Sequence, residues 1–293
     1  MLSWLGNWWN SIWQEPLTGL VQLLAALWNA STGIVINMIN INPQEYQGGT
    51  AWGLMVALNP IFVSIASGLL TVFFLMQFCQ ESVNLKEDFN MEKGMKLLIK
   101  VVLCNFLVKN TITIIQILFG MIGALCALLG FQSSMLDGFI NINRGYALIF
   151  HLTSGESFVG TIFAIIAVLA CIMFGYTLIR TVYYRFFKIY IAIPFAPVGM
   201  ATLVNSSVAQ TGVAYIKSFL AYTLEVVVMI LAFLIGYTLL GNGGVALVSF
   251  LPVDMQTDFI RFIVYLVEII ITLGLVTEAV KLAESTIRKL FGL

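Results

Sequence analysis

The side chains of this sequence that could take part in chemistry at membrane depth lie inside long apolar runs. Glu225 and Glu268 lie within such runs, and Arg261 precedes Glu268 by seven residues, which places the two on nearly the same helical face. An ionisable group at membrane depth is costly and usually faces a bundle interior or a water-filled cavity. Two interpretations follow: a cation or proton site, or a hydrogen bond or ion pair between helices.

The densest group of charged and aromatic residues runs from Arg180 to Lys188. Arg180, Tyr184 and Lys188 share a helical face, and Arg185 lies beside it. Basic side chains bind phosphates, and aromatic rings stack on bases. The group is therefore either a cytoplasmic anchor or a basic and aromatic rim that contacts a polyanion or an acidic partner.

Other kinds of chemistry find little support in the sequence. His151 is the only histidine, which argues against a histidine metal site or a catalytic triad. The four cysteines lie in apolar runs without CxxC spacing, as small buried side chains do. Nucleotide-binding, metalloprotease and hydrolase motifs were not found, so we expect no enzyme, no metal and no cofactor.

The composition indicates that a lipid environment positions these residues. The chain has 293 residues, of which 60% are hydrophobic and 10% charged, against about 25% charged in soluble domains. The mean hydropathy is +0.98. One soluble core cannot bury so much apolar surface, which excludes a soluble enzyme, a basic nucleic-acid-binding domain and a disordered chain.

We therefore predict an all-α polytopic membrane protein with about five transmembrane helices, since one span needs about 20 mostly apolar residues. Lysine-rich segments mark the cytoplasmic side, which places the N-terminus outside and the C-terminus in the cytoplasm. The predicted spans are Gly53–Cys79, Thr111–Gly130, Ser157–Ile179, Val226–Gly241 with an extension back to about 218, and about 259–280.

A sixth uncharged run, 189–216, contains Pro194 and Pro197. If it crossed the membrane, the basic C-terminal tail would lie outside, against the positive-inside rule. We therefore predict a proline-broken re-entrant or interfacial segment, with 189–204 as a candidate pore or interface element. The alternative is an ordinary sixth span with a proline kink.

Two further stretches do not fit a simple span. Residues 97–130 would form a helix of about 50 Å, longer than a hydrocarbon core of about 30 Å. Because Lys100 and Lys109 fall in its first part, we expect 92–110 to lie at the cytoplasmic boundary and the span to begin near Thr111. Residues 17–39 could span marginally, but an apolar stripe favours an amphipathic helix. The stripe consists of Leu17, Leu20, Leu24, Leu27 and Trp28.

All six tryptophans lie in the first 52 residues. Trp4, Trp8, Trp9 and Trp13 fall on neighbouring rows of one helical face, which is typical of an interfacial helix, and Pro16 is expected to end it. The helix is either an anchor or a docking surface. We thus divide the chain into an extracytoplasmic Trp-rich region (1–52), a transmembrane bundle (53–282) and a cytoplasmic amphipathic tail (283–293).

The order of these features resembles the TrbL-type polytopic inner-membrane subunit of conjugation and type IV secretion systems. At the level of sequence, the resemblance is confined to about 180–201, where Arg180-Thr-Val-Tyr-Tyr-Arg-Phe-Phe-Lys leads into the segment with Pro194 and Pro197. The chain lacks the large hydrophilic central loop of longer members, because 131–156 is only 26 residues long.

The resemblance implies a non-enzymatic channel or scaffold in the bacterial cytoplasmic membrane. The implied partners are other membrane subunits, the ATPases of the transfer machine and single-stranded DNA with its attached relaxase. The protein is expected to contact lipid and to form a homo-oligomer. The alternative is a secondary transporter or ion channel that uses Glu225 and Glu268, although paired broken helices and an internal repeat, common in such proteins, were not found.

Overall fold

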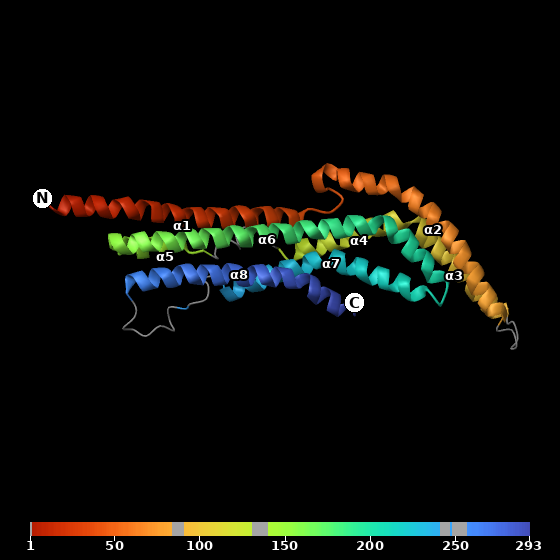
Figure 1. Ribbon diagram of the computed structural model, residues 1–293. Coiled ribbons are helices and arrows are strands. Elements are labelled where there is room, and N and C mark those ends of the chain that lie inside the picture. The colour runs from red at the N-terminus through yellow and green to blue at the C-terminus, as the bar shows by residue number, and fades with distance from the viewer. Residues whose placement is uncertain (1, 84–90, 131–139, 241–246, 248–256) are drawn as a thin grey trace. The chain divides into compact units, whose positions relative to one another are not determined.

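The computed structural model describes residues 2–83, 91–130, 140–240, 247 and 257–293, and in these ranges every regular element is a helix. The described helices follow one another along the chain as labelled in Figure 1. They are α1 (Leu2–Asn40), η1 (Tyr46–Gly49), α2 (Thr50–Val83), α3 (Met91–Lys109), α4 (Thr111–Leu128), α5 (Ile142–Phe150), α6 (Ser154–Ala201), η3 (Thr202–Val204), α7 (Ala209–Leu240) and α8 (Asp258–Leu290).

The described residues contain six helices that are long and apolar enough to cross a membrane. This confirms the all-α polytopic membrane class and adds one helix to the predicted five. The additional helix is the N-terminal one. The candidate spans are Gln14–Asn40, Tyr46–Ser82, Thr111–Leu128, Gly155–Val204, Ala209–Leu239 and Asp258–Leu290.

The chain forms two compact units, each assembled from three separate stretches of sequence. Unit 1 comprises 1–39, 129–183 and 228–283, and unit 2 comprises 40–128, 184–227 and 284–293. The predicted tail from residue 283 is no separate element, because α8 continues to Leu290.

In unit 1, α1 packs against the first part of α6. Leu17, Leu24 and Trp28 are buried, on the helical face that the sequence indicated for 17–39. At Gly175 an added Cβ would lie 2.4 Å from the Ser31 hydroxyl, so the two helices approach closely. The stripe therefore packs on protein.

The prediction that Pro16 ends the helix is wrong, because α1 continues through it. Proline lacks a backbone N–H and so removes one helical hydrogen bond, and neighbouring helices can compensate this loss in an apolar environment.

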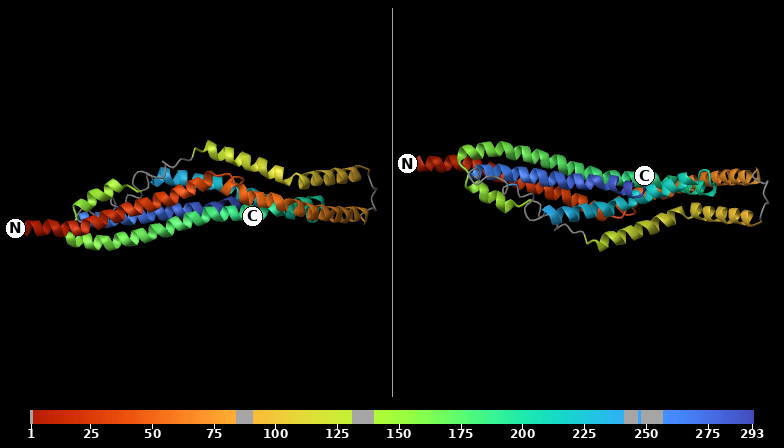
Figure 2. Two further views of the ribbon diagram at one scale, coloured as in Figure 1. Left: turned by 90° about the horizontal axis from the view of Figure 1, so that it is seen from above. Right: turned by 90° about the horizontal axis from the view of Figure 1, so that it is seen from below.

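In unit 2, α2 and α3 form a hairpin that packs against the end of α6 (Figure 2). Cys104 and Val108 of α3 join Ala66 of α2 and Val204 in one buried cluster. A turn at Asn110 separates α3 from α4, which begins at Thr111. This boundary confirms the predicted start of the span.

The prediction that the prolines break the chain is wrong. Pro194 and Pro197 lie inside α6, and the chain reverses only at 202–208. Neighbouring helices can compensate a proline's missing hydrogen bond in an apolar environment. Beyond the reversal α6 and α7 pack closely, because an added Cβ at Gly212 would lie 2.6 Å from the Gly199 carbonyl oxygen.

Many hydroxyl side chains in these helices bond to their own helix. Their oxygens donate to the carbonyl four residues earlier, as Ser31 does to Leu27 and Thr277 to Leu273, both at 2.8 Å. Such bonds satisfy the hydroxyl without a partner helix. The same pattern occurs at Thr32, Ser67, Thr71, Thr111, Thr161, Thr177, Thr181 and Thr223.

Candidate functional site

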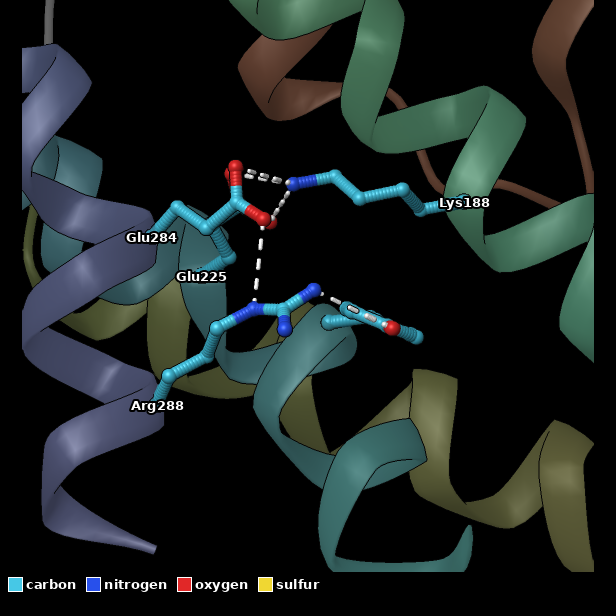
Figure 3. A network of polar contacts seen from close by, with 5 residues as sticks. Lys188, Glu225, Glu284 and Arg288 are labelled. Atoms are coloured by element: carbon cyan, nitrogen blue, oxygen red, sulfur yellow. Dashed lines mark hydrogen bonds and ion pairs between the residues drawn. The ribbon is translucent and has the colours of Figure 1, made fainter. Parts of the chain in front are cut away.

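The largest cluster of paired charges in the described chain lies in unit 2 and joins α6, α7 and the last turns of α8. We call it the ion network: Lys188, Glu225, Glu284 and Arg288 (Figure 3). The Lys188 Nζ lies 2.8 Å from Glu225 Oε2 and 3.0 Å from Glu284 Oε2. One ammonium group therefore holds two carboxylates from two different helices.

Burial differs sharply within the ion network. The side chain of Glu225 is 1% exposed and that of Lys188 10%, whereas Glu284 is 33% exposed. Arg288 forms an ion pair of 3.2 Å with Glu284 and is 42% exposed. The inner pair, Lys188–Glu225, is thus shielded from water, whereas the outer pair, Glu284–Arg288, is partly solvated. Removal of one partner of a buried pair leaves an unpaired charge, which strongly destabilises the fold.

Two tyrosines surround the cations of the ion network. The Lys188 ammonium lies 5.2 Å from the ring centre of Tyr184 and 5.7 Å from that of Tyr222. The Arg288 guanidinium lies 5.4 Å from the Tyr222 ring and donates a hydrogen bond of 3.3 Å to its hydroxyl. These contacts attract the positive charges toward the ring faces and help to hold both side chains in place.

A groove of ≈ 490 Å³ opens beside Lys188 between α6 and α7. Its walls are mainly aromatic, and Ser218 and Lys188 supply polar groups. Tyr215 also lines the groove and donates a 2.7 Å hydrogen bond to the Ala192 carbonyl. The further lining residues are Tyr184, Phe187, Ile191, Phe195, Phe219 and Tyr222.

Arg185, predicted as part of an exposed basic rim, is buried instead. Its side chain is 2% exposed, and its Nε and Nη1 atoms have no hydrogen-bond partner among the described residues. The guanidinium carbon lies 4.8 Å from the ring centre of Phe186, which stacks on Tyr46. Because Arg185 is buried and Lys188 is paired, the predicted rim does not form; of its three cations only Arg180 is exposed.

The second buried glutamate, Glu268, lies in unit 1 and pairs with a residue that the sequence did not indicate. Arg144 Nη1 of α5 donates a 2.7 Å hydrogen bond to Glu268 Oε2. Arg261, which the sequence places on nearly the same helical face as Glu268, forms an ion pair of 3.7 Å with Asp258. Of the two interpretations of Glu268, the structure shows the ion pair between helices, here between α5 and α8.

The remaining predicted residues take varied positions. Tyr184 is exposed, whereas Pro194 and Pro197 are buried within α6. Lys109 is exposed at the end of α3, and Lys100 is half-buried. The side chains of Trp4, Trp8, Trp9 and Trp13 lie outside the described part of the chain, so their anchoring role stays a prediction.

Sequence reasoning missed Glu284, Arg288 and Tyr222 as members of the site. One signal was available: Glu284 and Arg288 are four residues apart, the spacing of a helical ion pair. Their proximity to Lys188 depends on tertiary packing, which spacing does not reveal.

The ion network can hold charges in fixed positions. The described residues include no group of side chains that could bind a metal ion.

Comparison with family models, with curated proteins and with solved structures finds no match to this chain.

Proposed function

We propose that this protein is a non-enzymatic scaffold or channel subunit of a conjugative DNA-transfer apparatus of the type IV secretion class. In this role it helps to move a DNA–protein substrate across the bacterial cytoplasmic membrane. The proposal rests on the TrbL-type resemblance at 180–201, and one structural observation supports it. Glu225 and Glu268, the buried acids within spans, are each held by a cation, which suits a fixed scaffold.

The same pairing weighs against the alternative of a transporter or ion channel. A carboxylate that binds and releases a cation or proton needs a path to water and freedom from a permanent counter-ion. Glu225 bonds Lys188 through both oxygens, at 3.1 and 2.8 Å, and is 1% exposed. Proton or cation flux that persists in an E225Q/K188M double variant would also exclude this pair as a transport site.

Contacts with other subunits need surfaces that other helices of the chain leave open. On α4 an added Cβ at Gly120 or at Gly123 meets nothing within 4 Å. These residues belong to the small-residue pairs Gly120–Ala124 and Gly123–Ala127, a spacing that permits close approach of a second membrane helix. This open face supports the expected assembly with neighbouring subunits or copies.

The decisive experiment is deletion and complementation in a donor cell. Loss of the chain should abolish transfer, and the tagged protein should co-purify with the ATPases and membrane subunits of the machine. Transfer that continues at the normal rate without the chain would refute the proposal.

Arg180 offers the sharper variant, because it is exposed whereas Arg185 is buried. We expect Arg180→Glu to lower transfer by about tenfold or more through charge reversal at a contact, with normal membrane insertion. Lys281→Ala, on an exposed site paired with Glu278, is the matched control and should leave transfer unchanged. Equal transfer by both variants would remove Arg180 from the mechanism.

A further inference from the structure

Unit 2 has a polar layer at each end of its α6–α7 helix pair. At the chain reversal, Gln77 Oε1 accepts hydrogen bonds of 2.9 Å from both the backbone N–H and the hydroxyl of Ser206. The Ser207 hydroxyl donates to Gln80 Oε1 at 3.3 Å, and Asn205 Nδ2 donates to the Phe73 carbonyl at 3.4 Å. We call this group the turn layer. The ion network forms the second layer.

The separation of these layers is slightly less than the thickness of a bilayer's hydrocarbon core. From Lys188 to Asn205 the chain advances 17 residues, or about 26 Å of helix. From Ala209 to Glu225 on α7 it advances 16 residues, or about 24 Å. The hydrocarbon core of a bilayer is about 30 Å thick.

The interior between the two layers is mainly apolar. One buried cluster contains Met200 and Val204 together with α2 and α3 residues, and it lies beside the turn layer. The next contains Ile189, Ile193 and Phe219 with Phe119 of α4, and it reaches the ion network. The two clusters fill the distance between the layers with hydrocarbon.

The outer surface of the same helices is apolar as well. Ile65 on α2 is 52% exposed, Val102 on α3 67%, Met121 on α4 59% and Ile191 on α6 64%. Large apolar side chains exposed on four helices need a cover other than water. Lipid acyl chains suit a surface that continues around several helices at one depth.

Two exposed lysines, Lys109 and Lys217, lie between the layers and must be accommodated. Lys109 follows Val108, which packs beside Val204 near the turn layer. Lys217 precedes Tyr222, whose ring contacts Lys188 of the ion network, by five residues, or about 8 Å. A lysine side chain can extend along apolar surface to place its ammonium group at the membrane boundary, so each can reach a polar layer.

We propose that unit 2 crosses the bilayer, with acyl chains around α2, α3, α4 and α6, so that 189–204 traverses the membrane instead of returning to the same side. The turn layer and the ion network then lie on opposite faces of the membrane. This separates Arg288 from the turn layer, whereas the sequence placed the C-terminal tail and the end of 189–216 together in the cytoplasm. The inference is independent of the proposed function.

Cysteine accessibility tests this arrangement. In a chain whose four cysteines are replaced by alanine, single cysteines are introduced as Ser207→Cys in the turn layer and Tyr184→Cys beside the ion network, both at exposed positions. A membrane-impermeant maleimide is applied to right-side-out and to inverted vesicles. Each cysteine should react in one vesicle orientation only, and the two orientations should differ. Reaction of both in the same orientation would overturn the proposal.

Phe195→Cys provides the matched measurement at mid-depth, because Phe195 is 52% exposed on α6 between the layers. A fluorescent bimane on this cysteine should be quenched most by lipids that carry a nitroxide deep in the acyl chain, and it should resist aqueous iodide. Stronger quenching by iodide than by the deep nitroxide would show that the segment does not lie in the hydrocarbon core and would equally overturn the proposal.

Discussion

Glu225 and Glu268 are both almost fully buried, at 1% and 2% exposure, yet the two units hold them differently. In unit 1, Glu268 forms an ion pair with Arg144, whose side chain is 32% exposed. In unit 2, Lys188 is 10% exposed and binds Glu225 and Glu284 at once, with Arg288 on the outer side.

The difference shows which residue controls the charge balance of each unit. Loss of Lys188 would leave two carboxylates close together, one of them without access to water. Loss of Arg144 would vacate a partly solvated position that water can fill. Unit 2 should therefore depend on a single cation far more strongly than unit 1 does.

The largest effect is expected for Lys188→Met. Breaking a buried ion pair by removing one partner costs about 3–5 kcal/mol, so the variant should unfold at a much lower SDS fraction in mixed micelles. The double variant K188M/E225M removes both charges and should recover most of the lost stability. Failure of the second substitution to restore stability would mean that the charge balance is not what Lys188 supplies.

Next in size is the effect of adding a methyl group where helices are in closest contact. Gly212→Ala places a Cβ 2.6 Å from a backbone oxygen, which cannot move aside, and should cost about 1–3 kcal/mol. Gly175→Ala meets only the Ser31 side chain, so its smaller loss should disappear in a G175A/S31G double variant. Gly68→Ala on α2 meets open space and serves as the control in the same unfolding assay.

Arg144→Met tests the balance of unit 1. Because the arginine is partly exposed, we expect a loss of about 1–2 kcal/mol from the weakened compensation of Glu268, measured as the shift in unfolding midpoint. A loss as large as that of Lys188→Met would contradict the distinction between the two units. A second variant, E268Q, should lessen the effect of Arg144→Met.

The smallest change is expected for Arg261→Met. Its ion pair with Asp258 is 3.7 Å long and both side chains are more than 40% exposed, so the free energy of unfolding should change by less than about 0.5 kcal/mol. A larger change would show that Arg261 contributes to unit 1 through interactions other than this ion pair.

The sequence was sufficient for the helical class and for several boundaries, because these depend on local signals. The lysines of 92–110 and the polar Asn110 correctly placed the start of α4 at Thr111. The stripe of Leu17, Leu24 and Trp28 correctly gave the buried face of α1. What covers this face could not be predicted, since an apolar stripe does not reveal whether lipid or another helix lies against it.

The charge partners could not be predicted in the same way. Arg144 and Glu268 are separated by 124 residues, and no periodicity relates α5 to α8. Arg185 was assigned to the rim because it lies in the same short run of basic and aromatic residues as Arg180 and Tyr184. In the structure it is buried against Phe186, which stacks on Tyr46. We expected Pro16, Pro194 and Pro197 to end or break helices, as prolines usually do in water-soluble proteins, where the proline leaves a backbone carbonyl without its hydrogen bond.

The hydroxyl groups bonded along their own helices carry a consequence for how this protein could be redesigned. Ser31, Thr32 and Thr277 count as polar on any hydropathy scale, yet their donors are already used. Exchanging such threonines for valine keeps the shape of the side chain and removes no link between helices. Contacts between the helices therefore depend on other groups, such as the close glycine contacts, the ion pairs and the hydrogen bonds of the turn layer.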